Sequence, residues 1–222
     1  MDLMNLLRSV EALLYEIVSW LLFYPLTLWR CIVKPIEMMI YAEQELTDPR
    51  EEQFVDALSP PLFLFLTLVV AHLLQISFGT MTFESDGVLG DERNQLLYRA
   101  VLFSLLPLIV GVQRVWQNGL PLNRSTLRPA FYSQCYLAVP FVLAFDVSLV
   151  ISQRPDAWAK PVAGGLFGAG LVWYIACLTT WFVRHNKASI SSALMRSLAT
   201  LLAASAIFIT VAALTALAIN TH

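Results

Sequence analysis

The chain has 222 residues, of which 58% are hydrophobic and only 14% are charged, and its formal net charge is −2. A soluble domain carries about 25% charged residues, so this composition excludes an ordinary soluble fold and indicates a large lipid-facing surface. The net charge says nothing about nucleic acid, and the sequence has no basic cluster that would suggest nucleic acid as a partner.

Residues 1–59 are expected to form a cytoplasmic, interfacial N-terminal segment. From Leu3 to Val18, apolar residues recur at three- and four-residue spacing, and polar residues occupy the opposite face. These polar residues are Asn5, Arg8, Ser9 and Glu16. The pattern predicts an amphipathic helix that lies in the membrane interface.

Pro25 is expected to divide this region into two helical pieces, because a proline ring clashes with the carbonyl four residues earlier. The alternative is a sixth span over residues 12–33. Glu16, Pro25 and Arg30 count against that alternative, since charged residues are costly within a span.

Five later stretches are nearly uncharged and are each about as long as a bilayer-spanning helix. They cover residues 60–78, 96–116, 131–151, 162–183 and 194–219. A hydrocarbon core about 30 Å thick needs about 20 apolar residues, and a backbone in lipid must satisfy its own hydrogen bonds. The fold class expected is therefore all-α: an integral membrane bundle of five transmembrane helices over residues 60–219, preceded by interfacial amphipathic helices.

Two short motifs accompany this layout. They are the basic-aromatic stretch Trp29-Arg30-Cys31-Ile32-Val33-Lys34-Pro35 and the span entry Ser59-Pro60-Pro61-Leu62-Phe63-Leu64. Together with five closely spaced spans, they resemble bacterial members of the Yip family of membrane proteins. That family includes eukaryotic proteins that interact with Rab-type GTPases in membrane traffic, and its bacterial members are often labelled permeases. The resemblance implies a five-span topology and a non-enzymatic function, and it carries over no functional residue.

The distribution of basic residues predicts the orientation. Ten of the 14 Lys and Arg residues precede the first span or flank the second-to-third and fourth-to-fifth connections, and four flank the other side. Cytoplasmic loops carry the excess of Lys and Arg. We therefore expect a multi-pass protein of the inner membrane, with its N-terminus in the cytoplasm and its C-terminus outside.

Four polar residues project to the outer third of the spans under this orientation. They are His72, Gln75, Arg99 and Asp146. Ionisable groups at membrane depth are costly and are therefore candidates for function. One interpretation is a proton relay or a substrate contact, because histidine titrates near neutral pH. The other is an Arg99–Asp146 pair that locks two spans together, with His72 bonded to a backbone carbonyl.

Two further sets of residues are candidates for contacts. Arg114, Arg124 and Arg128 lie at the inner face, where they can bind lipid headgroups or act as ordinary topology determinants. Gly164 and Gly168 form a small-xxx-small surface for close helix approach. That surface would pack the fourth span against the fifth, or one copy of the chain against another.

No catalytic pattern accompanies the spans. The chain has no phosphate-binding glycine loop, no pair of histidines on one helix and no Cys-x-x-Cys pair. Its three histidines are scattered, and Cys31, Cys135 and Cys177 are expected to be buried thiols. The sequence therefore predicts no enzyme, no metal site and no cofactor.

The function expected is that of a non-enzymatic, Yip-like protein that organises the membrane or serves as an accessory, partner-binding component. The alternative is a small permease whose path is lined by the first three spans. The partners expected are membrane lipids, a protein bound through the N-terminal segment and a second copy of the chain.

Overall fold

The computed structural model describes residues 3–78, 92–186 and 189–220, and within these ranges every regular element is a helix. The seven helices are α1 (Leu3–Val33), α2 (Pro35–Glu45), α3 (Pro60–Ser77), α4 (Glu92–Gln117), α5 (Arg124–Ser152), α6 (Ala159–Asn186) and α7 (Ile190–Asn220). The predicted all-α class is therefore confirmed.

Within the described residues, six helices are long and apolar enough to cross a membrane. Five of them, α3 to α7, contain the five predicted spans to within one residue. The sixth candidate lies within α1 and covers Leu7–Val33. The predicted count of five spans is thus not confirmed by helix length and composition, although these helices are compatible with a membrane-embedded bundle.

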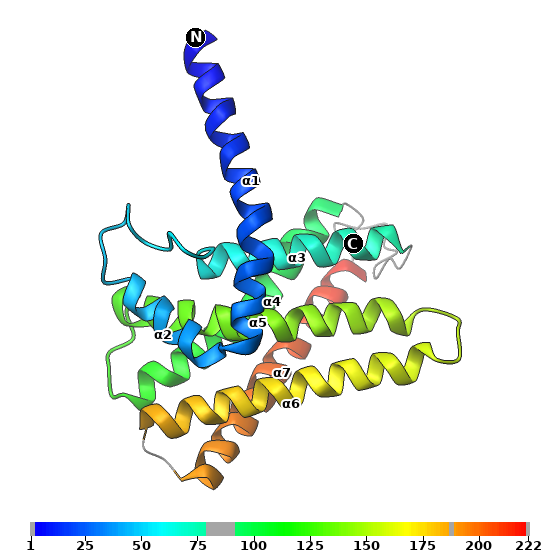
Figure 1. The fold of residues 1–222 in the computed structure, drawn as a ribbon. Helices are drawn as coiled ribbons and strands as arrows, with labels where there is room; N and C mark the ends of the chain where they lie inside the picture. The colour runs from blue at the N-terminus through cyan, green and yellow to red at the C-terminus, as the bar shows by residue number, and fades with distance from the viewer. Residues whose placement is uncertain (1–2, 79–91, 187–188, 221–222) are drawn as a thin grey trace.

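Helix α5 is the centre of the bundle and packs against α1, α2, α3, α4 and α6 (Figure 1). Its middle is buried on all faces, from Ser133 to Pro140. Its start is fixed by a capping box, in which Asn123 Oδ1 accepts from the Thr126 amide at 2.9 Å and Thr126 Oγ1 accepts from the Asn123 amide at 3.1 Å. Around it, the helices run between two ends of the bundle.

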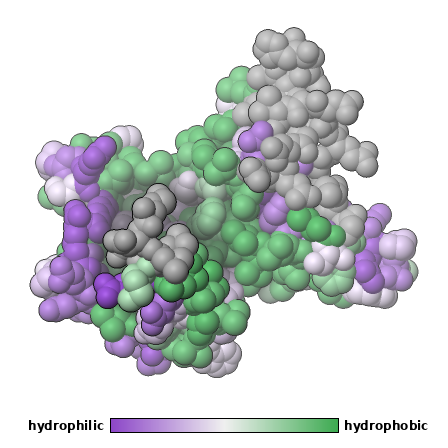
Figure 2. All heavy atoms as spheres, turned by 90° about the horizontal axis from the view of Figure 1, so that it is seen from above, coloured by the Kyte–Doolittle hydropathy of each residue, from purple (hydrophilic) through white to green (hydrophobic). Residues whose placement is uncertain are grey.

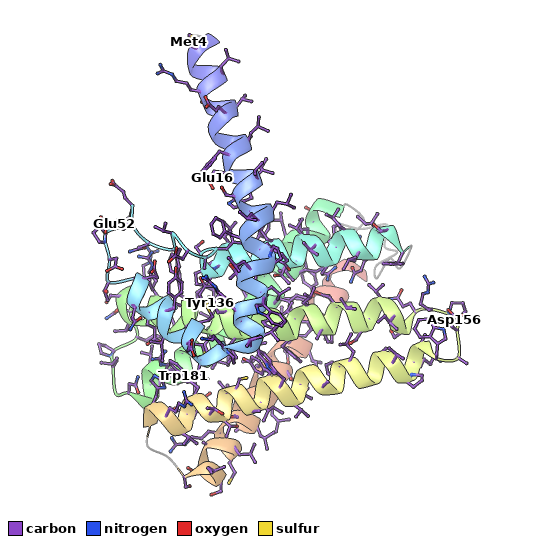
Figure 3. All side chains as sticks on the ribbon, viewed as in Figure 1. Met4, Glu16, Glu52, Tyr136, Asp156 and Trp181 are labelled. Carbon is purple, nitrogen blue, oxygen red and sulfur yellow. The ribbon has the colours of Figure 1, made fainter. Side chains whose placement is uncertain are left out.

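We name these two ends by their loops. The connector end holds α2 and residues 46–59, here called the connector, and the distal end holds the turn at Asp156. Figure 3 shows Glu52 and Trp181 toward the connector end and Asp156 at the opposite side. Figure 2 shows hydrophilic residues gathered along the left of the molecule, where the connector lies, and hydrophobic residues across its middle. This banding is the pattern that a bilayer requires.

The chain breaks at Pro35 and not at Pro25. Helix α1 continues through Pro25 to Val33, and Pro35 then occupies the first turn of α2. Lys34 has φ −130° and ψ 53°, outside the helical region, because a residue before proline is disfavoured there. The turn is favoured by packing, since it buries Met39 and Ala42 of α2 completely. The expectation of two N-terminal helical pieces holds, but the predicted position of their break is wrong.

The N-terminal half of α1 leaves the bundle. In Figure 1, α1 runs up the page, across the directions of α3, α5 and α6, and Figure 3 shows Met4 far from every other helix. Its apolar side chains are exposed as a result, and Leu21 reaches 79%.

Hydrogen bonds at the connector end hold the other half of α1. Tyr24 donates its hydroxyl to Thr67 Oγ1 at 3.2 Å, and the Leu58 amide donates to Thr27 Oγ1 at 3.2 Å. Arg30 Nη1 donates to the Asp56 carbonyl at 3.0 Å. We call these contacts the connector latch. Thr27 and Thr67 are completely buried, so the latch ties α1 to the start of α3 from within the core.

The connector is folded back on the bundle. The Phe54 amide donates to Glu45 Oε2, and the Phe54 ring lies 6.2 Å from that of Tyr41 and 6.0 Å from that of Tyr132. Phe54 has a positive φ of 59°, which is uncommon for a bulky residue. The ring contacts and the Glu45 bond hold this conformation in place.

The expected packing of Gly164 and Gly168 within the chain is wrong. A Cβ placed at either residue meets no atom within 4 Å, because α6 packs against its neighbours with another face. Close approach occurs instead at Gly111, whose Cβ would lie 3.2 Å from the Phe131 amide nitrogen, and at Gly170, whose Cβ would lie 3.0 Å from Ala144 Cβ. Contact between two copies through Gly164 and Gly168 stays a prediction.

This difference predicts opposite responses to the same substitution. Gly111→Leu should lower the free energy of unfolding by about 1–3 kcal/mol, because the added side chain meets backbone of α5. Gly165→Leu should not lower it, because a Cβ at Gly165 meets no atom within 4 Å. Thermal unfolding of the purified protein in detergent measures both, and equal melting temperatures for the two variants would contradict the packing.

Candidate functional site

Three helices contribute to a buried polar cluster near the distal end. Gln75 lies in the last turn of α3, Arg99 lies two turns into α4, and Asp146 lies nearly two turns before the end of α5. Arg99 Nη2 donates to Asp146 Oδ1 at 2.5 Å, and Arg99 Nη1 donates to Gln75 Oε1. The guanidinium therefore bridges α3 and α5.

The cluster is closed to its surroundings. Residue exposure is 5% for Gln75, 6% for Arg99 and 1% for Asp146. A buried charge loses its hydration, so each ion depends on the other for its stability. The bonds between charged and polar atoms are of the strong, charge-assisted kind. The arrangement can therefore lock α3, α4 and α5 together.

One atom of the cluster stands out. Asp146 Oδ2 is buried and has no hydrogen-bond partner within the described part of the chain. A buried oxygen in that condition is rare. It can accept a proton or a hydrogen bond from a molecule that reaches it.

His72 is not among the residues that these contacts join. It lies one turn before Gln75 on α3 and is half-buried. Of the four predicted residues, the structure thus brings Gln75, Arg99 and Asp146 together in one set of bonds.

Arg114 belongs to a second polar site, at the connector end. Its guanidinium forms a two-bond ion pair with Glu43 of α2, with Nη2 3.0 Å from Oε2, and donates to Ser133 Oγ at 3.2 Å. It also lies 4.7 Å from the centre of the Trp181 ring, which is a cation–π distance. Arg114 therefore joins α2, α4, α5 and α6.

The other two predicted headgroup residues are placed differently. Arg124 and Arg128 are exposed in the first turns of α5, and Arg128 lies 5.1 Å from the Tyr132 ring centre. Of the three arginines, these two present their charge outward at the connector end.

Several polar contacts between helices escaped sequence reasoning. Thr200 Oγ1 donates to Gln113 Oε1 between α7 and α4, and Thr179 Oγ1 donates to Ser197 Oγ at 3.2 Å between α6 and α7. Glu43, which forms the ion pair with Arg114, lies one turn after the fully buried Met39. Residues four apart on a helix share a face, so this spacing was the one sequence signal that could have predicted that the Glu43 carboxylate faces the bundle.

Comparisons with known proteins do not assign a function to these sites. The chain matches no model of a known protein family, no curated protein and no solved structure. The resemblance to the Yip family therefore stays a prediction. Within the described residues, no group of three His, Cys, Asp or Glu side chains is placed to hold a metal ion.

The Arg99–Asp146 pair predicts a strong coupling in stability. Arg99→Met and Asp146→Leu should each lower the free energy of unfolding by about 3–5 kcal/mol, since each leaves one buried charge without its partner. The double variant should cost less than the sum of the two, because it leaves no charge behind. Unfolding in mixed micelles measures the cycle, with Arg124→Met as a control at an exposed arginine, and additive losses would contradict the coupling.

Proposed function

We propose that the protein is a non-enzymatic, multi-pass membrane protein that organises one leaflet of the bilayer. In this proposal α3 to α7 cross the membrane, and α1 lies in the membrane plane as an amphipathic anchor. One observation carries the proposal: the N-terminal half of α1 leaves the bundle across the direction of the other helices, with its apolar face uncovered.

The apolar side of α1 supports this placement. Leu7, Leu14 and Leu21 recur every seven residues, close to two helical turns, and all three are exposed. An uncovered apolar stripe of this length is stable only where something apolar covers it, and a membrane interface does so.

The polar side of α1 supports it independently. Arg8 and Glu16 are exposed on the opposite face. Arg30 lies fourteen residues after Glu16, close to four turns, so it continues this face along the helix. Arg30 donates to the Asp56 carbonyl of the connector. The polar face of α1 is thus turned toward the hydrophilic connector end.

The same end is the cytoplasmic end in this proposal. It carries exposed Arg124 and Arg128, and the basic excess of short loops marks the cytoplasm. The N-terminus is then cytoplasmic, the C-terminus is outside, and the membrane is the inner membrane. A protein partner bound through residues 1–59 and a Yip-like accessory function both fit this arrangement.

An amphipathic helix inserted in one leaflet favours curved membranes. The proposal therefore predicts that the protein makes vesicles smaller. Full-length protein in liposomes should reduce vesicle diameter by about half at high protein density, as measured by electron cryomicroscopy. Leu14→Glu combined with Leu21→Glu should abolish the effect, because both residues point away from the bundle. Arg8→Glu changes charge on the polar face and should retain it. Equal diameters for all three proteins would contradict the proposal.

The alternative is a small permease with a path among α3, α4 and α5. The specific observation in its favour is the buried, unpartnered Asp146 Oδ2. Proton-linked flux in the same liposomes, lost in Asp146→Asn and His72→Ala but retained in the α1 variant, would replace the first proposal with this one.

A further inference from the structure

Helices α6 and α7 meet at the connector end and separate toward the distal end, as Figure 1 shows for the yellow-to-orange ribbon of α6 and the orange-to-red ribbon of α7. Near the connector end, Thr179 of α6 bonds to Ser197 of α7. Farther along, Phe167 of α6 stays against α5, whereas Phe208 of α7 lies 5.8 Å from Phe103 of α4. The two helices thus open a lateral gap between their distal halves.

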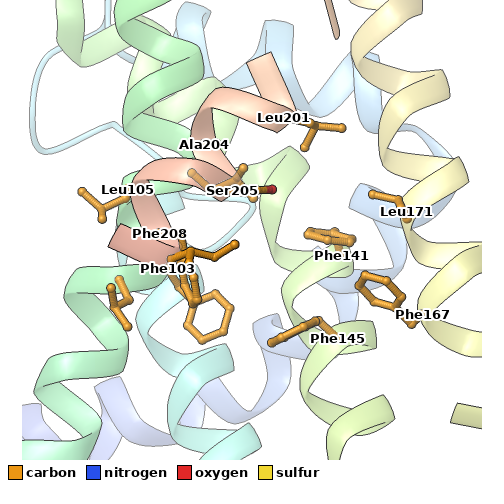
Figure 4. Close-up of a pocket in the computed structure, with 13 residues that line it drawn as sticks. Phe103, Leu105, Phe141, Phe145, Phe167, Leu171, Leu201, Ala204, Ser205 and Phe208 are labelled. Atoms are coloured by element: carbon orange, nitrogen blue, oxygen red, sulfur yellow. The ribbon is translucent and has the colours of Figure 1, made fainter. Parts of the chain in front are cut away.

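This gap leads into a cavity of about 380 Å³ between α4, α5, α6 and α7. Figure 4 shows aromatic side chains around it from all four helices. The phenylalanines that line it are Phe103, Phe141, Phe145, Phe167 and Phe208. Ser205 and Ile209 of α7 also line it and are exposed, Ile209 at 65%. The cavity therefore opens along the flank of α7 that carries these two exposed residues.

The lining selects the chemistry of an occupant. Among the described residues that line it, none is charged, and Ser205 is the single polar one. The volume falls within the range of ligand pockets. An apolar void forfeits dispersion contacts unless a chain fills it, and a cavity that opens sideways within a membrane faces hydrocarbon chains.

A basic residue lies on the face of α6 that carries Phe167, nearer the distal end than the cavity. Lys160 is seven residues before Phe167, which places it about 10 Å nearer the distal end on the same side of the helix. It is exposed and forms no ion pair with any described residue. That position suits a phosphate whose chain enters the cavity, since a basic residue near the membrane surface attracts anionic headgroups.

We propose that the lateral gap between the distal halves of α6 and α7 binds one acyl chain of a phospholipid, with its phosphate against Lys160. The site does not include α1. A test of lipid binding there is therefore independent of the leaflet-organising function proposed for α1. The proposal thus assigns one specific lipid-binding site, in contrast to the unspecific lipids that surround the whole bundle.

Photocrosslinking in lipid nanodiscs tests the site. The probe is phosphatidylglycerol with a diazirine on one acyl chain, and labelled peptides are mapped by mass spectrometry. Labelling should concentrate on residues 166–171 and 204–209. Ser205→Trp, which fills the open side of the cavity, should reduce it at least fivefold. Leu202→Trp is the matched control, because Leu202 is 71% exposed on α7 and does not line the cavity.

A second arm tests the headgroup. Lys160→Gln should weaken labelling by phosphatidylglycerol about fivefold, whereas Arg124→Gln, at the other end of the bundle, should not change it. A diacylglycerol with the same diazirine, which carries no phosphate, should label less and should not respond to Lys160→Gln. Thermal unfolding verifies that each variant folds, and Ile209→Trp replaces Ser205→Trp if the latter does not.

Two outcomes would overturn the proposal. Labelling spread over all exposed faces and equal in Ser205→Trp and Leu202→Trp would mean a general lipid shell only. Labelling by the diacylglycerol equal to that by phosphatidylglycerol, with both unchanged in Lys160→Gln, would show that Lys160 makes no phosphate contact and would contradict a phospholipid as the occupant.

Discussion

The connector latch determines the direction of α1, and the proposed placement of α1 in the membrane plane depends on that direction. Its bonds come from three positions on the last three turns of α1 and reach both the connector and α3. Tyr136 of α5 adds a hydrogen bond from its hydroxyl to the Leu58 carbonyl at 2.6 Å. Because the latched half is rigid and the helix is continuous through Pro25, the first half has one direction available to it.

The bundle is held by polar contacts at both ends and by apolar packing between them. Arg114 with Glu43 joins four helices at the connector end, and Arg99 with Asp146 joins three near the distal end. The Arg99–Asp146 pair is buried, so removal of either partner costs more than the pair itself contributes, whereas the Arg114–Glu43 pair is partly exposed. Helix α7 lies outside these two clusters and is tied by weaker hydroxyl and amide bonds. The opening in the bundle lies beside this helix.

Hydropathy alone predicted α3 to α7, because a backbone in lipid has few alternatives to a helix. The meeting of Arg99, Gln75 and Asp146 was also predictable, since the topology placed all three at one depth and a buried charge requires a partner. The Glu43–Arg114 pair was not, because it depends on the turn at Pro35 and on how α2 docks against α5. Both Pro25 and Pro35 disfavour a continuing helix locally. Tertiary packing determines that the helix breaks at Pro35 and continues through Pro25. The prediction that Gly164 and Gly168 pack within the chain was wrong for the same reason. Their spacing shows that they share one face of a helix, but the tertiary structure determines which element covers that face.

The depth of the apolar face of α1 tests most directly whether α1 lies in the membrane plane. Spin labels placed singly at Leu7, Leu14 and Leu21 of the full-length protein in liposomes report depth through the ratio of oxygen to nickel-chelate accessibility. A helix in the plane predicts one shallow depth for all three labels. A spanning helix predicts depths that change by about 10 Å from each label to the next, at 1.5 Å per residue, and that result would contradict the account.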